Sequence, residues 1–436
     1  MDYKEINKLA FPAIIAGISE PVMALADTAI IGRLGTAELA GVGVGSSLFL
    51  LLVWMLAQTK SAISAIVSRY YGMGKTIEIG GFIVQSLLFN IIIGILTIAA
   101  TLGFMDYLFS LYNATGDLLE MSKSYYKIRV FGLPLALGTY GLFGVFRGLQ
   151  NTSWAMMISV SGGIINVILD FILVYGIDGF IPTFGVEGAA WASLVAQTMM
   201  FISTFLVLIR KRIITFFWEF KFDKNIKEFV KMFGNLLIRT IALNTAYFLG
   251  TKYATSYGQE YIAAHTIAMN IWLFSSFFID GYATAGNAIA GKLLGQNNSG
   301  GIAQIGKAIY RMSILVGTIL GLFYLGGYLF FGSLFTKDIA VVSVFESIFW
   351  IVIISQPING LSFGLDGIFK GLGKAALLRN TLLASTFVGF IPTLFLFDYW
   401  GFELHAVWFA FLVFMAFRGF ILLWKFNRDY SVKNFS

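Results

Sequence analysis

The feature that most constrains this chain is a series of twelve long apolar runs separated by short polar breaks. Each run is about 20 residues or longer, the length a helix needs to cross the hydrocarbon core of a membrane. Runs of this length without strict alternation predict helices rather than barrel strands. With edges good to about four residues, they fall near 9–32, 38–68, 79–104, 124–146, 154–176, 187–209, 228–250, 261–291, 304–331, 340–369, 376–397 and 403–424.

Composition supports the membrane interpretation. Hydrophobic residues make up 58% of the 436 residues and charged residues only 12%, whereas a soluble protein carries about 25% charged residues. Most of the outer surface must therefore contact lipid. The chain has no cysteine, which excludes thiolate metal sites and catalytic thiols.

The net charge of +7 is explained by the placement of the basic residues. About 21 Lys and Arg fall in the N-terminus, the C-terminus and the loops after even-numbered runs, and about six fall in the opposite loops. Cytoplasmic loops are rich in Lys and Arg, so we expect both termini to be cytoplasmic. This asymmetry, together with anionic lipid, accounts for the charge without a nucleic-acid partner.

The two halves of the chain repeat each other. One constant shift along the sequence places Pro134 on Pro357, Arg147 on Lys370 and Gly148 on Gly371. We call this shift, the distance from residue 134 to residue 357, the half-chain offset. Six spans per half is an even number, so both halves enter the membrane in the same direction. The prediction is an all-α membrane protein with two pseudo-symmetric six-helix lobes around a central cleft, a plan that parallel-repeat transporters use. The lobes would be 1–212 and 228–436, joined by a cytoplasmic segment, 213–227.

Several ionisable residues lie inside the predicted spans, where they are expensive and therefore usually functional. Asn166 and Asp170 are four residues apart and share one helix face. Pro12 and Pro21 each remove a backbone donor from the first span, so we expect that helix to bend. The ionisable candidates are Glu20, Asp27, Lys60, Asp170, Arg239, Asp280 and Asp366.

Clustered carboxylate and amide oxygens would suit a hard cation such as Na⁺. A proton site instead needs a carboxyl group whose ionisation is opposed by burial or by a second carboxylate. The structural alternative is that an Asp pairs with Lys60 or Arg239 and only joins helices. Apart from those two bases, acids outnumber bases within the spans, which favours a cationic cargo.

Motifs for catalysis are missing from the sequence. The stretch "GMGKT" at 72–76 lacks the first Gly of a phosphate loop, which would fall at Arg69. No nucleophile elbow supports hydrolysis. We therefore expect no enzymatic activity and no cofactor, and transport would be driven by an ion gradient.

Four stretches resemble a known family. "MALADTAIIGRLGTAELAGVG" (23–43) is similar to the first span of multidrug and toxic compound extrusion (MATE) transporters, "INVILDFILVYG" (165–176) to their fifth, and "GVEGAAWAS" (185–193) to the start of their sixth. "LDGIFKGLGK" (365–374), with Asp280-Gly281, resembles the DinF-like branch. The resemblance covers all twelve spans.

The resemblance implies which residues carry the function. Asp27 matches the essential acid of the first span, Asn166 and Asp170 match the fifth-span pair, and Ser193 stands where relatives often place a Thr of the same cation site. It also implies that helix 1 bends at Pro12 when the acid is protonated, and that Asp366 is an acid of the second lobe. Two features depart from the pattern: Met23 replaces a Tyr of some relatives, and the seventh span carries Arg239 and no acid.

The sequence therefore predicts an antiporter in the inner membrane of a prokaryote. It would export amphipathic, often cationic organic compounds as a monomer in exchange for H⁺ or Na⁺. Asp27, Asn166 and Asp170 would bind the ion, and Ser193 would complete the site. The main alternative is a flippase for lipid-linked oligosaccharides, which would need a cationic groove. A channel or receptor is a further alternative, which the repeat and the midplane acids disfavour.

Overall fold

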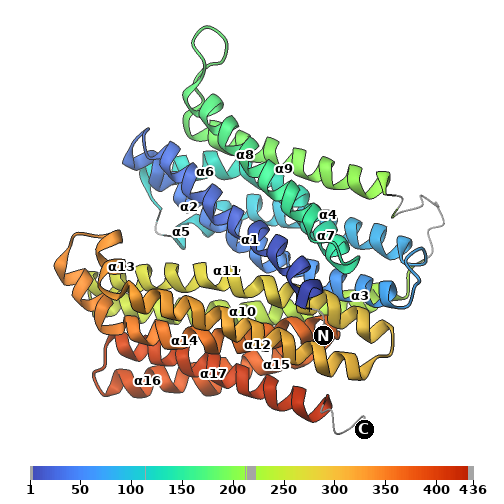
Figure 1. Cartoon of the computed structure of the whole chain (residues 1–436). Helices are drawn as coiled ribbons and strands as arrows, with labels where there is room; N and C mark the ends of the chain where they lie inside the picture. The colour runs from blue at the N-terminus through green and yellow to red at the C-terminus, as the bar shows by residue number, and fades with distance from the viewer. Residues whose placement is uncertain (1–2, 113, 212, 214–221, 431–436) are drawn as a thin grey trace. The chain divides into compact units, whose positions relative to one another are not determined.

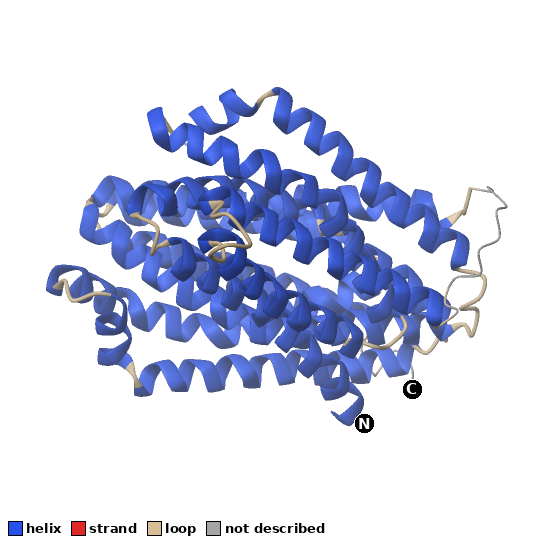
Figure 2. Ribbon diagram, turned by 90° about the horizontal axis from the view of Figure 1, so that it is seen from above, coloured by secondary structure: helices blue, strands red, loops and turns tan. Residues whose placement is uncertain are grey.

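The computed structural model describes residues 3–112, 114–211, 213 and 222–430. Nearly all of these residues are helical (Figure 2), and within them the only β pairing is an isolated bridge between Ile177 and Ile181. Helices are expected because backbone groups in hydrocarbon must find their hydrogen-bond partners within the same segment.

In the first half of the chain, the described residues form nine α-helices and one 3₁₀ turn (Figure 1). Two of the predicted spans, the second and the fourth, are each divided into two helices. The elements are α1 (Tyr3–Ile31), α2 (Thr36–Leu56), α3 (Thr59–Gly72), α4 (Gly80–Gly103), α5 (Met105–Ser110), α6 (Gly116–Arg129), η1 (Val130–Gly132), α7 (Leu133–Gly148), α8 (Ser153–Tyr175) and α9 (Gly185–Arg210).

The second half has the same order of elements with different interruptions. The counterparts of the divided spans are continuous here, and the eleventh span contains a π-helical turn. The elements are α10 (Asn225–Tyr257), α11 (Gln259–Gly295), α12 (Ser299–Gly326), α13 (Tyr328–Phe335), α14 (Ile339–Gly371), α15 (Ala375–Ala384), η2 (Ser385–Phe390), α16 (Ile391–Tyr399) and α17 (Leu404–Asp429).

The helix bounds repeat with the period that the sequence predicts. Thr36–Gly72 and Gln259–Gly295 are each 37 residues long, and the half-chain offset relates both their starts and their ends. The same offset relates Gly116–Gly148 to Ile339–Gly371. The two six-helix halves are therefore confirmed as structural repeats, whereas the cleft between them stays a prediction.

Eleven helical segments of the described chain are long and apolar enough to cross a membrane, so the protein is a multi-pass membrane protein. The remaining predicted span corresponds to α10, which is 33 residues long. Asn235, Arg239 and Asn244 interrupt its apolar sequence, so its hydropathy is lower than that of the other segments. Counting α10, twelve segments match the twelve predicted spans.

The helices pack as two compact units. The N-terminal lobe comprises Ile15–Tyr70 and Gly74–Phe229, and the C-terminal lobe comprises Met1–Ile14, Tyr71–Met73 and Val230–Ser436. Helix α1 therefore contributes its first residues to one lobe and its remainder to the other. The predicted connecting segment, 213–227, includes 214–221, which lie outside the described residues, and α10 already begins at its Asn225.

Candidate functional site

In the N-terminal lobe, α1 and α8 approach closely enough for their polar side chains to meet. A Cβ atom at Gly163 of α8 would lie 2.1 Å from Sδ of Met23 on α1, so the Met23 side chain packs directly against the surface of α8 at this glycine. One turn beyond the polar residues, the Tyr175 hydroxyl donates to the Ile30 carbonyl oxygen at 2.5 Å. These contacts fix the register of α1 against α8.

Asn166 connects the two acids of this lobe. Its Nδ2 donates to Oδ1 of Asp27 at 3.2 Å and to Oδ2 of Asp170 at 2.5 Å. The carboxyl groups of Asp27 and Asp170 also lie within hydrogen-bonding reach of each other. The structure thus brings together three of the four residues predicted for ion binding.

Asp170 is almost completely buried, and Asp27 is half-buried. Oδ1 of Asp170 accepts no hydrogen bond from the described residues. Two ionised carboxylates cannot donate to each other, but a shared proton, or a cation between them, would use this free oxygen. The site can therefore bind one more positive charge, a proton or a cation, at this free carboxylate oxygen.

Arg129 is a base near this pair that is not among the candidates predicted from the sequence. It acts electrostatically on both Asp27 and Asp170. Its Nη1 donates instead to Oε1 of Gln197 at 2.6 Å, and its guanidinium group lies 3.8 Å from the centre of the Phe49 ring. Among the described residues, neither carboxylate forms a salt bridge with Arg129 or with another base. Arg129 could have been identified as a candidate from the sequence, because it is a base inside the predicted span 124–146.

Ser193 is buried on α9, which packs beside α8 in Figure 1. It makes no hydrogen bond to Asp27, Asn166 or Asp170 within the described part of the chain. Its share in ion binding stays a prediction. The described residues also contain no group of three His, Cys, Asp or Glu that could hold a metal ion.

The other predicted residues of the N-terminal half are Lys60, Glu20, Pro12 and Pro21. Lys60 is half-buried, and its amine lies 5.3 Å from the centre of the Tyr140 ring. The side chain of Glu20 is outside the described residues. Pro12 and Pro21 both lie within α1, which is helical throughout, so the bend stays a prediction.

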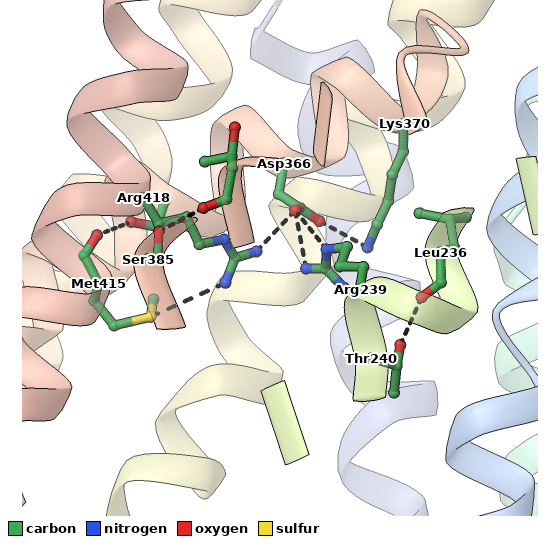
Figure 3. Close-up of polar contacts among 10 residues, drawn as sticks. Leu236, Arg239, Thr240, Asp366, Lys370, Ser385, Met415 and Arg418 are labelled. Carbon is green, nitrogen blue, oxygen red and sulfur yellow. Dashed lines mark hydrogen bonds and ion pairs between the residues drawn. The ribbon is translucent and has the colours of Figure 1, made fainter. Parts of the chain in front are cut away.

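In the C-terminal lobe, Asp366 lies between three bases (Figure 3). Its Oδ1 accepts hydrogen bonds from Nε and Nη2 of Arg239, at 3.2 and 2.9 Å, and lies 2.8 Å from Nη2 of Arg418. Its Oδ2 lies 2.8 Å from Nζ of Lys370. The sequence left open that an Asp inside a span pairs with Arg239, and Asp366 is such an Asp. Asp280 is exposed on α11.

This cluster corrects the balance of charges inferred from the sequence. The predicted balance counts only Lys60 and Arg239 as bases within the spans, but Arg129 and Arg418 also lie inside predicted spans, and Lys370 follows the predicted end of span 340–369 by one residue. Helix α14 continues to Gly371, and Lys370 lies one turn after Asp366 on the same face. In the C-terminal lobe the buried bases outnumber the buried acids, so the argument for a cationic cargo does not hold there.

Two repeated six-helix lobes, with paired carboxylates inside the membrane, define a membrane transporter built from parallel repeats. The chain belongs to the MatE family, whose model matches residues 12–172 and again residues 236–396. The double match confirms the internal repeat, and the expected MATE resemblance is confirmed with it. Members of this family are transporters.

Relatives extend over almost the whole chain. Protein DETOXIFICATION 44, chloroplastic, from Arabidopsis thaliana is 28% identical over 97% of this chain and 81% of its own length. DNA damage-inducible protein F from Escherichia coli is 26% identical over 97% of this chain and 92% of its own. A probable multidrug resistance protein NorM from Photorhabdus laumondii is 24% identical over 85% and 82%.

Solved structures share the fold. The crystal structure of MATE in the bent conformation aligns with a TM-score of 0.91 at 21% identity, covering 99% of this chain and 96% of the other. A MOP superfamily transporter from Pyrococcus furiosus, described as having a binding pocket of reverse polarity, aligns with a TM-score of 0.90 at 21% identity over the same shares.

Proposed function

We propose that the chain is a secondary antiporter that exports amphipathic organic compounds while H⁺ or Na⁺ moves inward, by alternating access. The family resemblance implies that the cargo is often cationic. We place the protein in the cytoplasmic membrane of a prokaryote, as a monomer with both termini in the cytoplasm. Membrane lipid surrounds it, and neither a cofactor nor nucleic acid takes part.

The observation that carries this proposal is the contact of Asp27, Asn166 and Asp170. Two carboxyl groups meet in a membrane-spanning region without a salt bridge from any described base. They need one additional positive charge, which the coupling ion would supply and remove during each cycle. A permanent ion pair could not serve this purpose, because it would compete with the ion.

The orientation that the Asn166 amide needs depends on which ion binds. As the side chain is placed, its NH₂ group faces both carboxylates, which suits a proton shared between them. Na⁺ requires oxygen ligands, so Asn166 would have to turn its amide oxygen toward the ion. Transport measured under separate H⁺ and Na⁺ gradients therefore distinguishes the two orientations of the Asn166 amide.

Helix α1 provides a route from ion binding to movement. Its first part packs in the C-terminal lobe, where Lys292 Nζ lies 2.7 Å from Oε1 of Glu5. Asp27 belongs to the part in the N-terminal lobe, and Pro12 lies just before the change of lobe at Ile14. A bend at Pro12 would couple the occupancy of Asp27 to the C-terminal lobe. One charge crossing 100 mV supplies about 2.3 kcal/mol for this step.

The test is efflux of ethidium from proteoliposomes under a pH gradient or a Na⁺ gradient, each imposed alone. Asp27→Asn should reduce ion-driven efflux by about 100-fold, the size of a strong coupling between two sites. Asp178→Asn, in an exposed loop, should retain the parent rate. Ion-driven efflux at the parent rate by a well-folded Asp27→Asn protein would refute the role of Asp27.

A flippase for lipid-linked oligosaccharides remains the second candidate. The bases around Asp366 favour it, because a pyrophosphate headgroup needs cationic partners. The same proteoliposomes, loaded with a lipid-linked oligosaccharide, would show headgroup translocation if this alternative is correct.

A further inference from the structure

The charged cluster around Asp366 is not balanced. Three bases, Arg239, Lys370 and Arg418, lie within 3.2 Å of one carboxylate. Asp280 acts electrostatically on Lys370, so even a wider count gives three bases and two acids. Tyr247 lies near Arg239 and Arg418, but a neutral phenol adds no counter-charge.

The imbalance is buried in the C-terminal lobe. The side chains of Arg418 and Asp366 are 1% and 3% exposed, that of Arg239 is 6% exposed, and that of Lys370 is 14% exposed, so two bases and one acid are buried even without Lys370. A buried ion pair that only joined helices would need one base for one acid, because each further charge must be desolvated without compensation. The excess of bases therefore indicates a counter-charge that the described residues do not provide.

Arg418 shows most clearly what is missing. Its Nη2 lies 2.8 Å from Oδ1 of Asp366, an oxygen that also accepts from Arg239, and its Nη1 reaches only Sδ of Met415, at 4.0 Å. A guanidinium group has five N–H donors, and both oxygens of Asp366 already contact other bases. Figure 3 shows Arg418 connected to Asp366 and to the sulfur of Met415, so one shared carboxylate and one weak acceptor serve its donors among the residues drawn.

We propose that Arg239, Lys370 and Arg418 bind an anionic group, a carboxylate or a phosphate, carried by an amphipathic cargo. Asp366 holds the three bases together while the site is empty. The planar guanidinium groups suit two-oxygen anions, which they bind through paired hydrogen bonds. This inference rests on the proposed transport function and adds the charge of one class of cargo.

A structural feature beside Arg418 allows the site to open. Helix α17, which carries Arg418, packs against η2, the π-helical turn at Ser385–Phe390. Such turns interrupt the regular hydrogen-bond pattern of a helix and are frequent at functional sites. A local change at η2 would release Arg418 from its buried position without unfolding α17.

The test compares two probes that differ in one group, 1-pyrenebutyrate and 1-pyrenebutanol, bound to the full-length protein in phosphatidylcholine nanodiscs. The parent should bind the carboxylate at least about tenfold more tightly, because hydrogen bonds to a charged group are strong. Arg418→Met should bring the two affinities within about twofold, and Arg418→Lys should lie between, since it keeps the charge but loses the fork.

Arg311→Met, on an exposed position of α12, is the matched control and should keep the full preference. If Arg418→Met does not fold, Arg418→Lys alone decides, because a purely structural role would leave its preference intact. No preference in the parent, or an undiminished preference in a folded Arg418 variant, would overturn the proposal.

Two further measurements separate the possible outcomes. Adding soluble short-chain phosphatidylglycerol in phosphatidylcholine nanodiscs should displace pyrenebutyrate from the parent protein, in proportion to the amount added, if the natural anion is a lipid headgroup, whereas short-chain phosphatidylcholine at the same concentration should not. Equal displacement by the two lipids indicates a free cargo. Binding is measured without any gradient, so the preference can hold even if ion-driven efflux fails. In the same way, Asp27→Asn should abolish ion-driven efflux but keep the preference for the carboxylate.

Discussion

The two lobes share their packing and differ in their charges. A Cβ at Gly144 would lie 2.5 Å from the backbone oxygen of Lys60, and a Cβ at Gly367 would lie 2.1 Å from that of Ala283. These two contacts are related by the same half-chain offset that relates the helices. The repeat thus preserves the close contact between its second and fourth spans, where only glycine fits.

Apart from Lys370, which falls on Arg147, the charged residues of these two clusters do not follow the repeat. The half-chain offset places Asp27 on Gly250, and it places Phe143 on Asp366. One lobe brings two acids together, and the other surrounds one acid with three bases. The fold therefore constrains the glycines in both lobes but leaves the polar interior free to diverge, which is where a transporter can acquire separate sites for ion and cargo.

The largest expected effect is a difference in stability when the same substitution, Asp to Asn, is made in each lobe. Asp366→Asn removes the carboxylate from three buried bases and should destabilise the protein by about 3–5 kcal/mol. Asp170→Asn removes one of two adjoining acids and should leave stability equal or higher. Thermal unfolding of the purified variants measures both, with Glu260→Gln as an exposed control in the C-terminal lobe. A similar loss in both variants would contradict the contrast in charge.

A smaller effect tests what the lobes share. Gly144→Ala and Gly367→Ala each force a methyl group against the backbone of a neighbouring helix, so each should destabilise by about 1–3 kcal/mol. Gly234 in α10 has no atom within 4 Å of its added Cβ. Gly234→Ala should therefore stabilise slightly, by up to about 1 kcal/mol. If only one of the two contact glycines mattered in thermal unfolding, the packing would not be equivalent.

The contrast also explains what could be predicted from the sequence. The fold was accessible because the length of the apolar runs and the constant offset between the two halves constrain the helices directly. Asp27 and Asp170 were accessible because an acid in an apolar run is conspicuous, and the face shared by Asn166 and Asp170 follows from helical spacing.

The bases around Asp366 were harder to predict. Lys370 lies at a helix end, where a sequence pattern resembles a loop, and the exact end of α14 decides its partner. Arg418 and Arg239 stand on different helices, so their convergence on Asp366 depends on tertiary packing. Arg129 could have been noted inside its span, but its contact with Gln197 rather than with an acid could not.

The smallest expected effect concerns the residue that distinguishes the acid pair from its counterpart. Asn166 is the one described side chain that donates to both Asp27 and Asp170, and the half-chain offset places it on Gly389. Asn166→Ala removes two charge-assisted hydrogen bonds but neither acid, so transport should persist with the half-saturating ion concentration changed by about tenfold, or about 1.4 kcal/mol. The control is Thr198→Ala, because in the described structure the Thr198 hydroxyl donates only to the Leu194 carbonyl oxygen of its own helix.

The direction of the change in half-saturating ion concentration shows what Asn166 does. If Asn166 serves only to hold the ionised pair, its loss should favour proton binding and lower the half-saturating H⁺ concentration. If its amide oxygen is a ligand for Na⁺, the half-saturating Na⁺ concentration should rise instead. An unchanged ion dependence for both ions would show that Asn166 positions α1 and α8 without contributing to coupling.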